Sequence, residues 1–276
     1  METFAERFAR LARERSPLCL GLDPSEEVFR RWGLASDAAG LRRFCQIITE
    51  AAGDRVAVVK PQAAFFERFG PAGMVELAAV TRKFREQGVL SLIDAKRGDV
   101  PGTMEGYAQA MLGPSSGFGG DAMTVSSYLG FEALRPAFDR ARDTGAAAFV
   151  VVHSSNPDGR ALQAALHEDG RTVAETLADQ IAATNVSTPG LVGAVVGATI
   201  AWDAVALIER LPEALILAPG VGAQGAELEE VGRKFEPARG RTLPSVSRDI
   251  LRQGPGIEPL REAIDRYRDL AWAACG

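Results

Sequence analysis

Residues 89–99 read Val-Leu-Ser-Leu-Ile-Asp-Ala-Lys-Arg-Gly-Asp, an apolar run that ends in a cluster of charges. A short continuous apolar run is typical of a strand buried on both faces, as in a parallel sheet. Asp94 and Lys96 stand two residues apart at its end, and an extended strand turns both side chains to the same face. The segment therefore predicts a buried strand that delivers charged groups to one edge of a sheet.

The same rhythm recurs along all 276 residues. Longer segments with helical periodicity, such as residues 38–52 and 257–274, separate the apolar runs, and Pro101 suits the first turn of a helix running to Met111. This alternation favours a (β/α)8 TIM barrel, an α/β fold, as a single domain over residues 1–276. A doubly wound open sheet has a similar pattern and remains the alternative. The predicted strands are Leu18–Leu22, Val56–Lys60, Val89–Asp94, Ala122–Val125, Ala147–His153, Leu191–Val196, Ala214–Ala218 and Thr242–Val246.

The composition sets limits on the function. A net charge of −5 argues against non-specific binding of nucleic acid, which depends on a basic surface. No apolar stretch approaches the roughly 18 residues of a membrane span, so no membrane association is expected. Cys19, Cys45 and Cys275 lack metal-ligand spacing, and so do His153 and His167. We therefore expect a cytoplasmic protein with reduced thiols, no metal site and no cofactor motif.

Charged residues also end the two strands before residue 89. Lys60 ends the second strand in Val-Val-Lys-Pro, and Asp23 ends the first in Leu-Gly-Leu-Asp-Pro. Each alone could be a helix cap or a rim charge, and Asp94 with Lys96 could be an ordinary surface ion pair. Three neighbouring strands that each bring a charge to one rim indicate an active site instead, because barrel enzymes carry their catalytic groups there.

A glycine-rich segment, Gly-Val-Gly-Ala-Gln-Gly at 220–225, follows the seventh strand. Such loops often serve only as turns. Its position after strand seven, together with Arg248 after strand eight, favours phosphate binding. The long polar connection from about residue 222 to 241 is interpreted as a lid that grips the phosphate, because long loops in compact domains are usually functional or mobile.

Asp-Ala-Lys-Arg-Gly-Asp at 94–99, with Leu-Gly-Leu-Asp-Pro at 20–24 and Pro-Gly-Val-Gly-Ala-Gln at 219–224, resembles the orotidine 5′-monophosphate decarboxylase family. The similarity extends from Leu20 to Arg248, and the length resembles the longer bacterial branch. The resemblance implies a metal-free and cofactor-free lyase that converts orotidine 5′-monophosphate to uridine 5′-monophosphate and CO2, the last step of de novo UMP synthesis. It also implies a homodimer with shared active sites.

The resemblance further implies a role for each matching residue. Lys60, Asp94, Lys96 and Asp99 would form a charged tetrad, with Asp99 reaching into the neighbouring subunit's site. Lys96 would stabilise and then protonate the carbanion at C6 of the pyrimidine. An ammonium held at a developing negative charge is also what this chemistry requires on general grounds.

The substrate contacts follow from the same resemblance. Ser155 would bind the pyrimidine, with Ser154 as the competing choice because the two serines are adjacent. Asp23 and Lys60, together with Thr103 of the neighbouring subunit, would contact the ribose hydroxyls. Pro219 would contact the pyrimidine, and Gln224 and Arg248 would bind the phosphate.

Two other functions compete with this one. A Mg²⁺-dependent sugar-phosphate decarboxylase of the same suprafamily would be expected to carry an acidic metal ligand where this chain has Lys60. A catalytically silent phosphate-binding barrel would be expected to lack part of the tetrad, whereas all four residues are present. Both alternatives are therefore disfavoured.

Overall fold

The computed structural model describes residues 1–200, 205–222 and 225–276. Its strands run parallel, and each pairs with the next strand along the chain. The first also pairs with the last, which closes the sheet into a barrel and rules out the open-sheet alternative. The strands are β1 (Cys19–Leu22), β2 (Val58–Pro61), β3 (Leu90–Arg97), β4 (Ala122–Val125), β5 (Ala147–His153), β6 (Val192–Val196), β7 (Ile216–Pro219) and β8 (Thr242–Val246).

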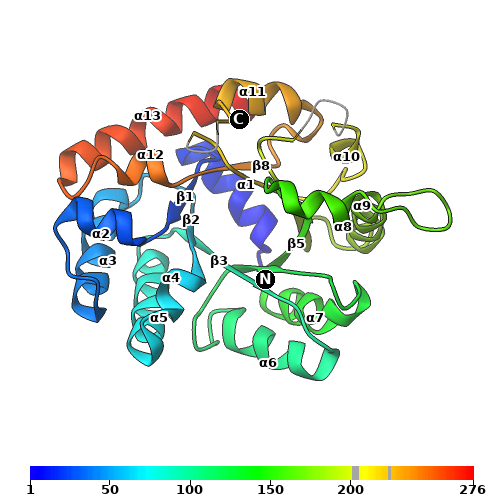
Figure 1. The fold of residues 1–276 in the computed structure, drawn as a ribbon, viewed down its shortest axis with the longest axis horizontal. Helices are drawn as coiled ribbons and strands as arrows, with labels where there is room; N and C mark the ends of the chain where they lie inside the picture. Colours follow the sequence, from blue (N-terminus) through cyan, green and yellow to red (C-terminus); the bar gives the residue numbers. More distant parts are fainter. Residues whose placement is uncertain (201–204, 223–224) are drawn as a thin grey trace.

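Helices connect the strands and surround them (Figure 1). Each predicted strand is present within three residues of its predicted bounds, and the helix expected from Pro101 to Met111 has those limits. The helices, with the 3-10 turns η1, η2 and η4, are α1 (Phe4–Arg15), α2 (Glu26–Trp32), α3 (Ala38–Ala52), α4 (Ala63–Glu67), α5 (Gly70–Glu86), α6 (Pro101–Met111), η1 (Glu132–Leu134), α7 (Arg135–Thr144), η2 (Pro157–Gly159), α8 (Arg160–Gln163), α9 (Val173–Asn185), α10 (Ala206–Glu209), α11 (Leu228–Lys234), η4 (Glu236–Ala238), α12 (Arg248–Leu251) and α13 (Ile257–Cys275).

The strands are apolar on both faces because two separate cores pack against them. Alternate residues of β5 illustrate the division. Phe149 belongs to the inner core of the barrel, whereas Val150 and Val152 belong to the outer core shared with the helices. This double burial explains why the strands read as continuous apolar runs rather than as alternating patterns.

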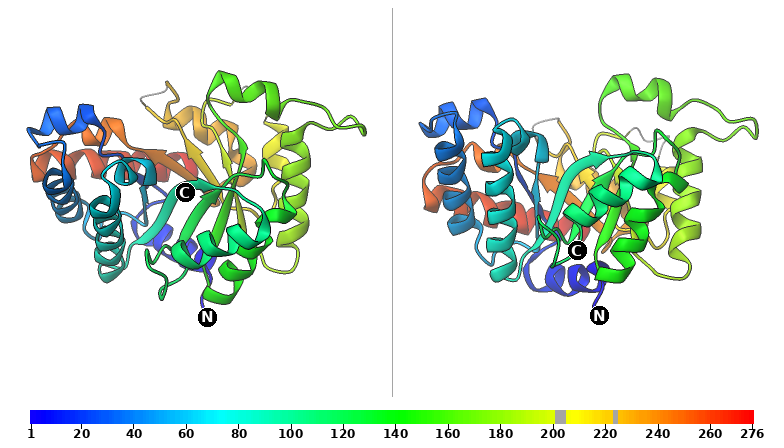
Figure 2. Two further views of the ribbon diagram at one scale, coloured as in Figure 1. Left: turned by 60° about the horizontal axis from the view of Figure 1, so that its bottom comes forward. Right: turned by 90° about the horizontal axis from the view of Figure 1, so that it is seen from below.

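Helix α1 closes the amino-terminal end of the barrel, below the strands in Figure 2. Thr3 and Glu6 form a capping box that fixes where the helix begins. Phe4 and Phe8 are fully buried and belong to the inner core, and the ring of Phe4 meets that of Phe149 edge-on at 5.8 Å. With this end filled, the carboxyl ends of the strands are left to form the site.

The segment interpreted as a lid is not uniform. From Leu228 onward it contains α11 and η4. Val231 of α11, Ala238 of η4 and Phe235 between them are buried and pack into the outer core beside α13. Half of the predicted range is therefore part of the helical layer. The gripping role stays a prediction; in the glycine-rich turn before α11, the N–H of Gly222 donates to the carbonyl of Ala226 at 2.8 Å.

Candidate active site

The three charged strand ends meet at one side of the barrel mouth. Gly21 of β1 pairs with Lys60 of β2, and Gln62 just beyond β2 bridges to Asp94 of β3. Lys60 and Asp94 are each only 5% exposed, while the side chain of Lys96 is 49% exposed. The structure therefore brings a buried ion pair and a half-exposed lysine together at this rim.

Asp94 lies at the centre of the cluster. One carboxylate oxygen, Oδ2, accepts a hydrogen bond from Lys60 Nζ at 3.0 Å. The other, Oδ1, accepts from Lys96 Nζ at 2.5 Å and from the hydroxyl of Thr124 at 2.8 Å. The side-chain oxygen Oε1 of Gln62 also accepts a hydrogen bond from Lys60 Nζ at 3.3 Å. A carboxylate with this many charge-assisted partners is fixed in orientation.

The charges hold one another ionised. Burial alone would raise the pKa of Asp94, but the ammonium groups of Lys60 and Lys96 outweigh burial and hold it well below its usual range. Burial would likewise lower the pKa of Lys60, but the carboxylates of Asp94 and Asp23 hold it above its usual value. At neutral pH the array consists of fixed ammonium and carboxylate groups, which suits it to stabilise charge that develops on a bound molecule.

Asp99 takes no part in this array within its own chain. It lies between β3 and α6, and its Oδ1 accepts the N–H of Val100 at 2.7 Å. Among the described residues it forms no ion pair with Lys60 or Lys96. Thr103, in the first turn of α6, is exposed to solvent. The structure thus separates Asp99 and Thr103 from the cluster that Lys60, Asp94 and Lys96 form.

Polar groups without partners mark the neighbouring rim. Oδ1 of Asp23 and the hydroxyl oxygen of Ser247 are buried. Neither atom forms a hydrogen bond with the described part of the chain. Arg248 is exposed at the start of α12, and Pro219 is half-buried at the end of β7. Buried polar groups are normally paired, so the unpaired ones are suited to contact a ligand.

Gln224 was predicted from the sequence to contact phosphate. It lies outside the described residues.

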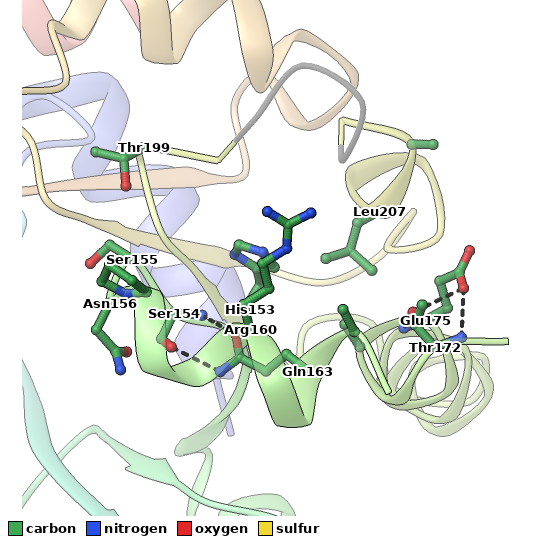
Figure 3. A pocket seen from close by; sticks show the side chains of 14 residues that line it. His153, Ser154, Ser155, Asn156, Arg160, Gln163, Thr172, Glu175, Thr199 and Leu207 are labelled. Atoms are coloured by element: carbon green, nitrogen blue, oxygen red, sulfur yellow. Dashed lines mark hydrogen bonds between the residues drawn. The ribbon is translucent and has the colours of Figure 1, made fainter. Parts of the chain in front are cut away.

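The loop after β5 carries the two candidate serines and borders a cavity of about 540 Å³ (Figure 3). Gln163 holds Ser154 through two hydrogen bonds: its Nε2 donates to the Ser154 hydroxyl at 2.8 Å, and its Oε1 accepts the Ser154 N–H at 3.1 Å. Ser155 is half-buried in the same loop. Lys60, Asp94 and Lys96 do not line this cavity, which therefore lies beside the charged array rather than around it.

Sequence reasoning did not identify Gln62 or Thr124 as members of the cluster. Gln62 lies two residues beyond Lys60, just after β2, and Thr124 is the one polar residue of β4, so each position carried a weak signal. In the described part of the chain, no three His, Cys, Asp or Glu side chains gather where they could hold a metal ion. No described helix is long and apolar enough to cross a bilayer.

Residues 16–263 match the model of the orotidine 5′-phosphate decarboxylase / HUMPS family. The chain belongs to this family. It is 49% identical over 271 residues to the orotidine 5′-phosphate decarboxylase of Myxococcus xanthus, covering 96% of this chain and 94% of that protein. The enzyme of the same name from Streptomyces coelicolor is 45% identical over 269 residues, or 97% and 96% of the two chains.

Solved structures agree with the family assignment. A Streptomyces avermitilis protein of known crystal structure matches 100% of this chain and 96% of its own, with a TM-score of 0.94 and 44% identity. The structure of Leishmania donovani OMP decarboxylase covers 99% of this chain and 98% of its own, with a TM-score of 0.81 at 31% identity. The resemblance inferred from Asp-Ala-Lys-Arg-Gly-Asp is confirmed over nearly the whole chain.

Proposed function

We propose that this protein decarboxylates orotidine 5′-monophosphate to uridine 5′-monophosphate and CO2, the last step of de novo UMP synthesis, without a metal ion or cofactor. The observation that carries the proposal is the Lys60–Asp94–Lys96 array at the carboxyl ends of β2 and β3. The close relatives that bear this enzyme's name support the substrate.

The array fits the electron flow of the reaction. The bond from C6 to the carboxylate breaks, CO2 leaves, and the electron pair stays on C6. The ammonium group of Lys96 stabilises this carbanion and then transfers a proton to it, which forms the product. The side chain of Lys96 is 49% exposed, so the resulting amine regains a proton from solvent. Asp94, held by three donors, orients both lysines.

The remaining contacts are assigned to groups around the array. Asp23 and Lys60 bind the ribose hydroxyls, which is supported by the unpaired Oδ1 of Asp23. Ser155 is assigned to the pyrimidine, with Ser154, which Gln163 holds through two hydrogen bonds, as the alternative. Gln224 and Arg248 are assigned to the phosphate, and Pro219 is assigned to the pyrimidine.

The proposal includes a homodimer in which Asp99 and Thr103 complete the neighbouring subunit's site. Asp99 has no lysine partner among the described residues of its own chain. Exposed apolar and aromatic side chains follow β3 and β4, where Val100 is 55%, Tyr128 79% and Leu129 53% exposed. A second copy of the chain that covered them would remove this surface from water.

A cytoplasmic location also belongs to the proposal. The three cysteines are unpaired and buried, and thiols persist in a reducing compartment.

The first experiment follows the loss of orotidine 5′-monophosphate absorbance in excess chelator. Wild-type protein and a Lys83→Ala variant, which changes an exposed lysine on α5, are expected to turn over, whereas Lys96→Ala is not. Turnover that required added Mg²⁺ would contradict the metal-free reaction. Absence of turnover by folded wild-type protein would overturn the substrate assignment, and sugar phosphates would be the next substrates to test.

The shared site has its own test. Lys96→Ala and Asp99→Ala are each expected to be inactive as homodimers, because every site lacks one group. Subunits exchanged between the two variants form a heterodimer in which one site has both Lys96 and Asp99. Recovery of activity on mixing supports the shared site, and active Asp99→Ala protein would contradict it.

A further inference from the structure

Thr124 is a fully buried polar residue in an otherwise apolar strand. Its hydroxyl uses both of its hydrogen-bonding functions at the charged array. It donates to Asp94 Oδ1 at 2.8 Å and accepts the backbone N–H of Lys96 at 2.9 Å. A single side chain on β4 is therefore bonded to the central carboxylate and to the main chain of the lysine.

The backbone at Lys96 is the part of β3 that most needs such support. Lys96 has a φ of +46°, in the left-handed region that residues with a side chain rarely adopt. The pairing of β3 with β4 is also irregular there. Ile93 pairs with Met123 and Arg97 pairs with Val125. Between these two pairs β3 therefore advances by four residues while β4 advances by two. This bulge takes the Lys96 N–H out of the regular ladder, and the Thr124 hydroxyl accepts it.

The bulge changes where the lysine can reach. Asp94 and Lys96 are separated by one residue of the same strand, yet Lys96 Nζ lies 2.5 Å from Asp94 Oδ1. The contact therefore forms from a lysine whose backbone is left-handed rather than extended. Strained backbone at a site persists only where its surroundings hold it, and Thr124 supplies such a hold from the neighbouring strand.

We propose that Thr124 is a positioning residue for decarboxylation. By bonding the Lys96 backbone and the Asp94 carboxylate together, it sets the place of the Lys96 ammonium group. This inference rests on the proposed function. Thr124 is not assigned a contact with substrate and acts through these two residues.

Substitution by valine and serine separates the hydroxyl from the methyl group. Thr124→Val keeps the shape but leaves the Lys96 N–H without its acceptor and Asp94 without one donor, whereas Thr124→Ser keeps both bonds. Thr242→Val is the matched control, because Thr242 is also fully buried on a barrel strand and its hydroxyl donates only to the carbonyl of Ala238 at 3.1 Å.

In Thr124→Val we expect kcat to fall about 100-fold, the loss typical of an ångström-scale displacement of a reacting group, with KM little changed. Thr124→Ser is expected to restore most of the rate, and Thr242→Val to behave as wild type. A Thr124→Val enzyme as fast as the Thr242→Val enzyme would overturn the proposal. So would a Thr124→Ser enzyme as slow as Thr124→Val, because the methyl packing would then be what matters.

Hydrogen exchange at the Lys96 amide distinguishes failure of this inference from failure of the proposed function. If wild-type protein does not turn over orotidine 5′-monophosphate, the substrate assignment fails by itself. Exchange at Lys96 that is faster in Thr124→Val than in both wild type and Thr242→Val would still support the positioning of the lysine backbone. Equal exchange in all three proteins would refute it.

Discussion

Replacement of Asp94 by asparagine tests whether Lys60 and Asp94 form a buried charge pair. Asparagine has nearly the same shape but no charge. Lys60 Nζ, 3.0 Å from Asp94 Oδ2 and on a residue only 5% exposed, would then stay buried as a cation without its main counter-charge. Since removal of one partner leaves the other charge desolvated, the variant is expected to be less stable than wild type.

The size of the loss follows from the geometry. Unit charges 3.0 Å apart attract by about 5–6 kcal/mol at an effective dielectric constant of about 20. Partial relaxation and water entry reduce this, and removal of one member of a buried pair typically costs about 3–5 kcal/mol. Lys96 adds little, because its side chain is 49% exposed and screened. We therefore expect Asp94→Asn to lower the free energy of unfolding by about 3–5 kcal/mol at pH 7.

The variant should also acquire a pH dependence that wild type lacks. In wild type the pKa of Lys60 is raised above its usual 10.5, so the stability from its charge is complete below that pH and is lost only above it. Burial is the largest influence on the pKa of Lys60, and loss of Asp94 removes the largest of the groups that oppose it, which leaves Asp23 and Cys19. The pKa of Lys60 then falls below 10.5, the unfolded chain binds more protons, and Asp94→Asn gains stability from pH 7 to about pH 9.5.

Urea unfolding followed by circular dichroism, at one fixed protein concentration, measures both effects. Asp265→Asn is the matched control, because Asp265 pairs with Arg55 at 2.6 Å with both side chains about one-third or more exposed. Such a surface pair contributes at most about 1 kcal/mol. If Asp94→Asn unfolds like Asp265→Asn at pH 7 and gains nothing at pH 9.5, the reasoning on buried charge is refuted.

Three further predictions concern other parts of the molecule. The pKa of Asp94 is held low and that of Lys60 is held high. The pH profile of kcat/KM should therefore show no loss of rate from protonation of Asp94 near pH 4 and none from deprotonation of Lys60 below about pH 10. A profile with either loss would contradict this. Phe8→Ala should lower the free energy of unfolding by about 3–5 kcal/mol in urea titrations, since Phe8 fills the closed end of the barrel, and a loss below 1 kcal/mol would argue against that role. Gln163→Leu should raise KM about tenfold, because the loop that carries Ser155 loses the two hydrogen bonds by which Gln163 holds it at Ser154, and an unchanged KM would contradict this role of Gln163.

The sequence predicted the barrel because burial on both faces leaves a direct trace. A strand such as β5 is read from its continuous apolar run, and its exact limits, Ala147–His153, followed from that run alone. The charges at Lys60 and Asp94 were found for the same reason, since each interrupts an apolar strand at its end. Local composition is sufficient where the pattern repeats along one segment.

Contacts that depend on the register between strands left no such trace. Thr124 reaches Asp94 only because β3 bulges against β4, and a bulge cannot be located from either strand alone. Gln163, the last residue of the four-residue helix α8, meets Ser154 nine positions earlier in the chain, and elements this short have no periodicity to detect. The helix α11 was missed within the predicted lid because its seven residues carry four charges, which conceal its buried face. Short elements and loop contacts depend on tertiary packing rather than on local pattern.

The charged array is better explained by chemistry than by stability. Transfer of Lys60 and Asp94 from water costs several kcal/mol for each ion, and a well-packed apolar pair of similar volume is often as stable or more so. The barrel nevertheless adds Thr124 and Gln62 to hold the two charges, and it accepts a left-handed residue at Lys96. The buried charges and the left-handed backbone cost stability, and together with Thr124 and Gln62 they hold the Lys96 ammonium group in a fixed position. A site organised in this way is suited to a carbanion, which needs a fixed positive charge before it forms.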